Sequence, residues 1–169
     1  MAAGRDDRAS VRAAQRGSAS GIEALFRLHW PRAYRAAYLV VHDAAAAEDI
    51  AQESFLAAVR NLDRFDRRRP FGPWLHRIVI NRAIDWSRAR QLRAESELLN
   101  IVASPEADAR LDDSLLAALA ALPPDHRAVI VLRHLLEYTP GEIAELLGLP
   151  RGTVNSRLRR GLDSLREQR

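Results

Sequence analysis

Arginine and aromatic side chains alternate along one stretch in the first half of the sequence, and together they have the chemistry to bind nucleic acid. Residues 60–93 contain ten arginines but only three acidic residues, all aspartate. Guanidinium groups neutralise phosphates and aromatic rings stack on unpaired bases, so the stretch predicts a surface for single-stranded nucleic acid. For Trp74 and Trp86 taken singly, packing in a core is the better-supported alternative. The side chains expected on this surface are Arg64, Phe65, Arg67, Arg68, Phe71, Trp74, Arg77, Asn81 and Arg88.

A second group of arginines follows a tight turn near the C-terminal end of the sequence. Thr139 and Glu142 have the spacing of a capping box at the start of a helix, and Pro140 suits its first position. Gly148 ends this helix and Pro150 begins a longer one, an arrangement typical of a helix-turn-helix that enters the DNA major groove. An ordinary amphipathic helix with a solvated basic face is the alternative. By helical phase, the outward side chains of the second helix are Thr153, Ser156, Arg157 and Arg160.

The helix expected over residues 44–60 has the opposite charge. Asp49, Gln52 and Glu53 share one arc of this helix with Leu56. A leucine surrounded by acidic and amide groups favours a docking surface, in which an apolar anchor lies inside a polar rim. The acidic sign argues against DNA, so the expected partner is a protein. A plain solvent-facing helix remains the alternative from these residues alone.

Helical periodicity and turn residues predict an all-α chain of two small domains. Residues 1–18 are polar and small, and are expected to form a disordered tail. A first helical domain is expected over 19–93 and a second over 112–169, joined by a flexible linker over 94–111. Pro31 is expected to break or kink the first helix unless it opens a new turn. Further helices are expected from Trp74 onward, over 115–122 and 125–136, and on both sides of Gly148.

Charge is distributed unevenly along the chain, whose net charge is +4. Residues 1–93 and 114–169 are both net basic, and residues 94–113 between them are net acidic. This division indicates a polyanionic partner contacted by both halves. The chain has no cysteine, which excludes disulfides and thiolate metal sites. No long apolar run and no signal peptide are recognisable, so we expect a soluble cytoplasmic protein without membrane insertion.

No catalytic or cofactor motif accompanies these binding residues. The five histidines are scattered along the chain. The sequence has no Glu-x-x-His pair, no glycine-rich phosphate loop and no serine elbow. We therefore expect no enzymatic activity, no cofactor and no metal.

Three segments in a fixed order indicate a family. The first half contains AEDIAQESFLAAV and then RFDRRRPFGPWLHRIVINRAIDWSR, and the second half contains LAALPPDHRAVIVLRHLLEYTPGEIAELLGLPRGTVNSRLRRGLDSLR. Together they resemble bacterial RNA polymerase sigma factors of the sigma-70 class, in the short extracytoplasmic-function (ECF) form that keeps only the second and fourth conserved domains. A helix-turn-helix alone is common among repressors and response regulators. The acidic helix and the Arg–aromatic block favour a sigma factor over the alternative, a stand-alone helix-turn-helix regulator that binds duplex DNA.

The resemblance implies a role for each set of residues. The first domain would contact the melted −10 promoter element, the second would read the −35 element, and the chain would bind the β′ clamp and the β flap of core RNA polymerase. Control by an anti-sigma factor that wraps or wedges between the domains is also implied. Asn155 stands where the family often has Lys or Arg, so the −35 sequence cannot be copied from other members. Docking on the β′ clamp would use Asp49, Gln52, Glu53 and Leu56, and the −35 element would meet the helix from Arg151, with Asn155, Ser156, Arg159 and Arg160 nearest the DNA.

Overall fold

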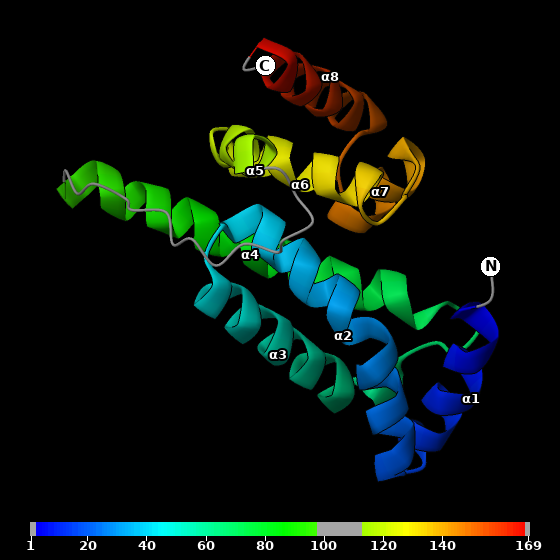
Figure 1. The fold of residues 1–169 in the computed structure, drawn as a ribbon. Helices are drawn as coiled ribbons and strands as arrows, with labels where there is room; N and C mark the ends of the chain where they lie inside the picture. Colours follow the sequence, from blue (N-terminus) through cyan, green and yellow to red (C-terminus); the bar gives the residue numbers. More distant parts are fainter. Residues whose placement is uncertain (1–2, 98–112, 168–169) are drawn as a thin grey trace.

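The structure is a computed structural model that describes residues 3–97 and 113–167. Within these ranges every regular element is a helix, which confirms the predicted all-α class, and no helix is long and apolar enough to cross a bilayer. The helices form two groups that follow the two halves of the chain (Figure 1). Most of the predicted linker lies outside the described residues. The elements are α1 (Ala3–Gln15), α2 (Ala19–Val41), α3 (Ala44–Arg60), the 3-10 turn η1 (Leu62–Arg64), α4 (Phe71–Glu97), α5 (Asp113–Ala120), α6 (Pro124–His134), α7 (Pro140–Leu147) and α8 (Arg151–Glu167).

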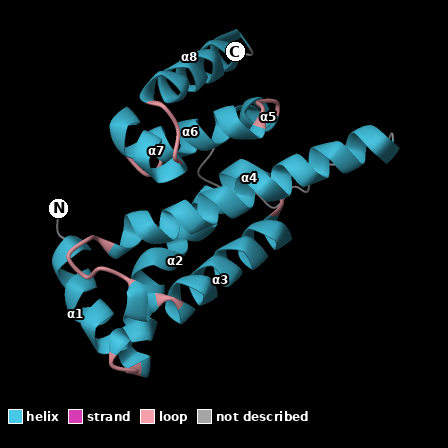
Figure 2. Cartoon of the chain, turned by 180° about the vertical axis from the view of Figure 1, so that it is seen from behind, coloured by secondary structure: helices cyan, strands magenta, loops and turns pink. Residues whose placement is uncertain are grey.

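Three long helices, α2, α3 and α4, form the body of the first domain (Figure 2). Leu25, Phe71 and Leu75 are fully buried in its core, and burying a side chain of this size contributes about 1.5–3 kcal/mol. Asp43 is the N-cap of α3, because its carboxylate accepts a hydrogen bond from the amide of Ala46 at 3.0 Å. The start of α3 is therefore fixed, and its outward face has a defined direction.

The N-terminal segment contains an ordered helix, so the prediction of a disordered tail over residues 1–18 was wrong. α1 packs against α2, with Val11 and Ala14 buried. Asp7 and His29 are buried as well, and the Asp7 Oδ1 and His29 Nε2 atoms are 2.8 Å apart. The segment has few apolar residues, so its own composition gives little sign of order. The contacts that order it come from α2, with further contacts from η1 and α4.

Two helix boundaries also differ from the sequence prediction. α2 continues through Pro31 as a single helix. Proline in a helix removes one backbone hydrogen bond, and packing of α2 against α1, α3 and α4 offsets that loss. α4 begins at Phe71 rather than at Trp74, because the buried Phe71 ring holds the first turn against the core. α4 also continues to Glu97, beyond the expected end of the domain at residue 93.

The predicted helix-turn-helix is present in the second domain. Thr139 and Glu142 form a complete capping box at the start of α7, and Gly148 ends α7 in the left-handed conformation with φ 66°. Leu146 of α7 is buried, whereas the neighbouring Leu147 is only partly buried.

The depth of α8 in the domain is set by close packing on α6. A Cβ atom at Gly161 would lie 2.6 Å from Cδ1 of Ile130, so any larger residue there requires the Ile130 side chain to shift. Val154 and Leu158 are buried on the same side of α8. The opposite side of α8 therefore faces away from the domain.

Arg127 on α6 joins the two domains. Its guanidinium group donates to the carbonyl oxygens of Ala120 at 2.7 Å and Leu122 at 2.8 Å, where α5 ends, and also to that of Val40 near the end of α2. Burial lowers the pKa of Arg127 to about 10, so the group is still charged at neutral pH. A single side chain thus holds a turn of the second domain against the first.

We expect acid to destabilise the protein, because two of its histidines have a lowered pKa in the folded state. Burial, the main cause, lowers the pKa of His42 and of His76 to about 4. Their pKa in an unfolded chain is about 6.5, so unfolding takes up protons between those values. The free energy of unfolding is therefore expected to be unaffected above pH 6.5 and to fall as the pH drops towards 4, by up to about 3 kcal/mol for each histidine. Urea denaturation across this pH range measures the loss.

Matched substitutions separate this effect from general acid denaturation. His76→Gln is expected to reduce the loss, because glutamine takes up no proton. It can also still hydrogen-bond Tyr138, whose hydroxyl oxygen is 2.7 Å from His76 Nδ1. His134→Gln, at an exposed position, serves as the control and is expected to retain the full loss. Equal pH dependence in both variants would contradict the role of His76.

Candidate nucleic-acid and protein interfaces

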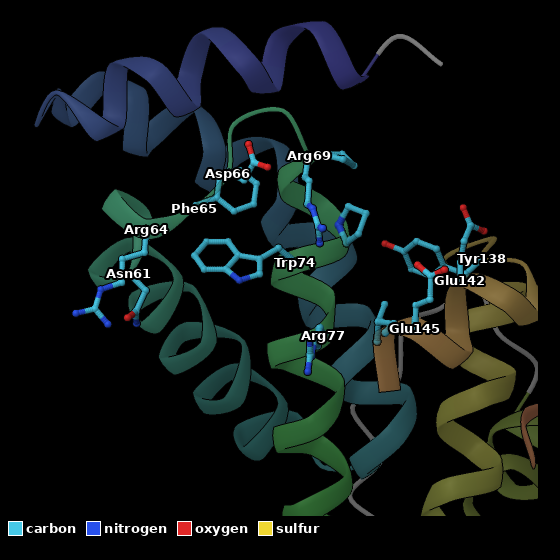
Figure 3. Close-up of a pocket in the computed structure, with 13 residues that line it drawn as sticks. Asn61, Arg64, Phe65, Asp66, Arg69, Trp74, Arg77, Tyr138, Glu142 and Glu145 are labelled. Atoms are coloured by element: carbon cyan, nitrogen blue, oxygen red, sulfur yellow. The ribbon is translucent and has the colours of Figure 1, made fainter. Parts of the chain in front are cut away.

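A groove of about 750 Å³ lies between the two domains, and the predicted Arg–aromatic residues form one side of it (Figure 3). The rings of Phe65 and Trp74 are stacked there, with centroids 4.7 Å apart and planes at 29°. Phe65 is buried and Trp74 is partly buried, so the Trp74 ring of this pair offers the face on which an unpaired base can stack. We call this site the aromatic groove; its lining residues are Asn61, Arg64, Phe65, Asp66, Arg69, Pro70, Pro73, Trp74, Arg77, Tyr138, Glu142, Glu145 and Leu146.

The two sides of the aromatic groove have opposite charge. Arg64 and Arg77 are exposed on the side of the first domain, whereas Glu142 and Glu145 of α7 lie on the other side (Figure 3). A hydrogen bond from the backbone amide of Thr139 lowers the pKa of Glu142, so its carboxylate stays ionised. A polyanion in the groove would therefore meet both arginines and carboxylates in this arrangement.

Phe71 supports the aromatic pair from below and is not part of the surface. It is 0% exposed, and its ring centroid lies 5.9 Å from that of Phe65 and 5.8 Å from that of Trp74. The expectation that Phe71 contacts nucleic acid is corrected accordingly, because no face of the ring is open. Trp74 is only partly buried and packs against the core, so it has both a packing role and an accessible part.

The other residues of the predicted nucleic-acid surface lie outside the aromatic groove. Arg67 and Arg68 line a separate cavity that they share with α1. Asn81 is exposed further along α4. Arg88 lies beyond it and pairs with Asp125 of α6, with 2.6 Å between Nη2 and Oδ1. The structure thus divides the predicted set among the aromatic groove, a second cavity and a contact between the domains, and leaves Asn81 exposed on α4 and Phe71 in the core.

The acidic face predicted on α3 is exposed. Asp49, Gln52, Glu53 and Leu56 all lie at the surface, and Leu56 is 45% exposed although it is a large apolar side chain. Glu53 forms an ion pair with Arg82 of α4, with 2.8 Å between Oε2 of Glu53 and Nη1 of Arg82. This face therefore combines an unburied leucine with carboxylates, the composition that the docking hypothesis requires.

Most of the arginines predicted on α8 face outward. Arg151, Asn155, Arg159 and Arg160 are exposed, whereas Thr153, Ser156 and Arg157 are partly buried. Arg157 pairs with Asp125, with 3.0 Å between Nη1 and Oδ1. Asp125 therefore binds Arg88 and Arg157 together, one arginine from each predicted DNA-binding set.

Comparisons with known proteins match both halves of the chain. The family model described as "Sigma-70 region 2" matches residues 25–93, and "Sigma-70, region 4" matches residues 112–165. The ECF RNA polymerase sigma factor SigW of Bacillus subtilis is 33% identical over 94% of each chain. This chain belongs to the ECF family of sigma-70 factors. The ECF sigma factor SigL of Mycobacterium tuberculosis is also similar, with 34% identity over 94% of each chain.

An ECF sigma factor directs promoter-specific transcription initiation by RNA polymerase and is not itself an enzyme. The predictions of family, function and lack of enzymatic activity are thereby confirmed. The alternative, a stand-alone helix-turn-helix regulator, leaves region 2 unexplained. A solved structure of CnrH in complex with the cytosolic domain of CnrY has TM-score 0.72 and 27% identity, covering 96% of each chain. The sigma factor RpoE, solved with the anti-sigma factor NepR from Bartonella quintana, shares the fold with TM-score 0.71 and 23% identity, covering 86% of this chain and 94% of that one.

Sequence reasoning missed several residues that shape the surfaces of this sigma factor. Asp125 and Tyr138 were assigned no role, since their partners lie far away in the sequence. Glu145 faces the aromatic groove from α7 and gave no sequence signal for that position. Arg8 and Arg12 did offer a signal, because their spacing puts both on one face of a helix. This spacing was not used, because the segment was expected to be disordered.

Proposed function

We propose that the aromatic groove of region 2 holds an unpaired base of the melted −10 element. The observation that supports this most directly is the stacked pair of Phe65 and Trp74 beside the exposed Arg64 and Arg77. The rings replace part of the stacking that the base loses, at about 1–3 kcal/mol per base, and the arginines neutralise its phosphates. Core RNA polymerase holds the protein in register with the DNA and performs the chemistry.

Run-off transcription with purified core RNA polymerase tests this function. Mapping start sites after overexpression in the host supplies the promoters, together with the sequences of both promoter elements. We expect specific transcripts from those promoters only when the protein is added. Transcription that does not depend on the protein, or that starts at no defined site, would contradict the proposal.

The exposed face of α8 is proposed to bind the −35 element in the major groove. Arg160 has the outward direction and the planar guanidinium fork that suit a bidentate contact to a base. Asn155 is exposed on the same helix, and its side-chain amide prefers a different base from the one that Arg or Lys prefers. The order of bases at −35 is therefore expected to be particular to this protein.

Arg160→Ala is expected to weaken binding to a promoter with an intact −35 element by about 1–3 kcal/mol, because a bidentate base contact is lost. The affinity of holoenzyme for fragments with intact and substituted −35 elements measures it. Arg166→Ala is the matched control, since Arg166 is exposed in the last turn of α8 and pairs with Asp163. An equal loss on both fragments would make Arg160 a phosphate contact only.

The acidic face of α3 is proposed to dock on the β′ clamp of core RNA polymerase, and region 4 on the β flap. Leu56 would be the apolar anchor on α3, and Asp49 and Glu53 part of its charged rim. We further propose that an anti-sigma factor covers these surfaces in the cytoplasm. The similar solved RpoE structure is a complex with an anti-sigma factor. Purification of the tagged protein from its host, followed by mass spectrometry, tests for such a partner.

The double substitution Asp49→Arg with Leu56→Arg is expected to weaken binding to core polymerase by about 2 kcal/mol or more, because it removes the anchor and reverses a charge. Fluorescence titration of labelled protein with core enzyme measures the affinity. Glu23→Arg, an exposed charge reversal on α2, is the control and should bind normally. Unchanged affinity of the double variant would exclude this face from docking.

A further inference from the structure

A second cavity, of about 410 Å³, lies beside region 2 and is lined by four arginines: Arg8, Arg12, Arg67 and Arg68. Two of them belong to α1, and the other two belong to the loop between η1 and α4. All four are exposed. We call this site the basic cavity. The four charges meet there because α1 packs beside that loop.

Little negative charge in the described part of the chain offsets these arginines. Asp66 binds Arg68, with 3.0 Å between Oδ1 and Nε. Arg8, Arg12 and Arg67 form no ion pair with another described residue. Guanidinium groups gathered around a cavity create a positive potential that attracts a polyanion, and their planar forks match the geometry of phosphate oxygens.

α1 is held in a fixed position relative to the aromatic groove. Gln15, at its end, donates from Nε2 to the carbonyl oxygen of Leu62 at 2.9 Å and to that of Phe65 at 3.1 Å. The buried contact between Asp7 and His29 holds the other part of the helix on α2. Phe65 therefore belongs to the base-stacking pair and also anchors α1 through its backbone. The basic cavity cannot shift far without disturbing that residue.

We propose that the basic cavity binds the phosphate backbone of the same DNA strand whose base enters the aromatic groove. The proposal rests on the proposed function, since it takes that strand to lie across Phe65. Among the residues that the structure describes, those lining the cavity are all arginines, and none of them is an apolar anchor of the kind that protein partners use. Nucleic acid therefore fits it better than an acidic protein does. α1 thus extends the strand-binding surface of region 2.

The test uses holoenzyme and a fluorescent promoter fragment in which the −10 segment of one strand is left unpaired. The double variant Arg8→Ala with Arg12→Ala is compared with Arg16→Ala with Arg27→Ala, which removes the same charge from exposed positions outside the cavity. The first is expected to lose roughly two- to thirtyfold in affinity, from two exposed ion pairs. The slope of log affinity against log salt concentration should also become smaller in magnitude by about 1.4, as expected when two single-strand phosphate contacts are lost.

The control pair is expected to retain the wild-type slope, and Arg8→Lys with Arg12→Lys should retain most of it because the charge remains. Binding to core polymerase is measured for each variant, so that a folding defect is recognised. Equal losses in the two alanine pairs would overturn the proposal and leave the proposed function intact. A wild-type holoenzyme that does not prefer this fragment to one with a scrambled −10 segment would overturn both.

Discussion

Replacing Arg127 with alanine is expected to separate region 4 from region 2 and to lower the free energy of unfolding by about 2–5 kcal/mol. Its guanidinium group donates to carbonyl oxygens of Ala120, Leu122 and Val40. Each acceptor left without a donor costs about 1–3 kcal/mol unless water reaches it. The oxygen of Val40 lies where α6 packs on α2, so leaving it without a donor favours movement of α6 away from α2. Urea denaturation measures the stability, and small-angle X-ray scattering measures the increase in radius of gyration.

Two substitutions distinguish this role from a general loss of charge. Arg133→Ala removes an exposed arginine from the same helix and is expected to cost less than about 1 kcal/mol without expansion. Arg127→Lys keeps the charge, but its ammonium group cannot reach all three carbonyl oxygens as the forked guanidinium group does. An intermediate loss of unfolding free energy is therefore expected. An Arg127→Ala protein as compact and as stable as the wild type would show that other contacts hold the domains together.

The contacts between the domains bear directly on promoter binding. Asp125 binds Arg88 and Arg157, and both arginines belong to the sets proposed to contact DNA. Glu142 and Glu145 face the aromatic groove, where a strand would have to lie. If both regions bind the promoter through the proposed residues, region 4 has to leave this position. Polymerase and DNA can shift the equilibrium towards the open arrangement only if they bind it more tightly than the closed one. The size of the shift is set by that difference in binding free energy.

Features specified by neighbouring residues were predictable from the sequence. The capping box of Thr139 and Glu142 and the left-handed Gly148 define α7 within a few residues, and the structure has both. The exposed face at Leu56 follows from helical period alone. Family resemblance then supplied what these local patterns leave open, namely that the two halves form one sigma factor.

Features specified by distant residues were not predictable in this way. α1 is ordered by α2, and Pro31 lies inside a helix that its neighbours stabilise. The hydrogen bond from Arg127 to Val40 spans 87 positions, and no local pattern indicates it. For Phe71, composition suggested a surface role like that of its neighbour Trp74. Only the packing of α4 in the folded domain shows that Phe71 is buried while Trp74 is partly accessible.

Phe71→Ala is expected to lower the free energy of unfolding by about 3–5 kcal/mol, the cost of deleting a fully buried aromatic ring and leaving a cavity. Its ring contacts those of Phe65 and Trp74 and lies 5.1 Å from His29, so region 2 loses support at several points. Urea denaturation measures the change. A loss below about 1 kcal/mol would contradict the burial of Phe71 and restore it as a candidate DNA contact.

Trp74→Ala gives the complementary result, because the Trp74 ring is only partly buried and forms the open face of the stacked pair. We expect it to weaken binding to the unpaired −10 fragment by about 1–3 kcal/mol, the contribution of one stacked base. Phe71→Leu, which keeps most of the buried volume, should bind that fragment nearly as the wild type does. If Phe71→Leu instead lost as much affinity as Trp74→Ala, the base would have to reach the inner ring, and the aromatic groove would be deeper in the bound protein than in the free one.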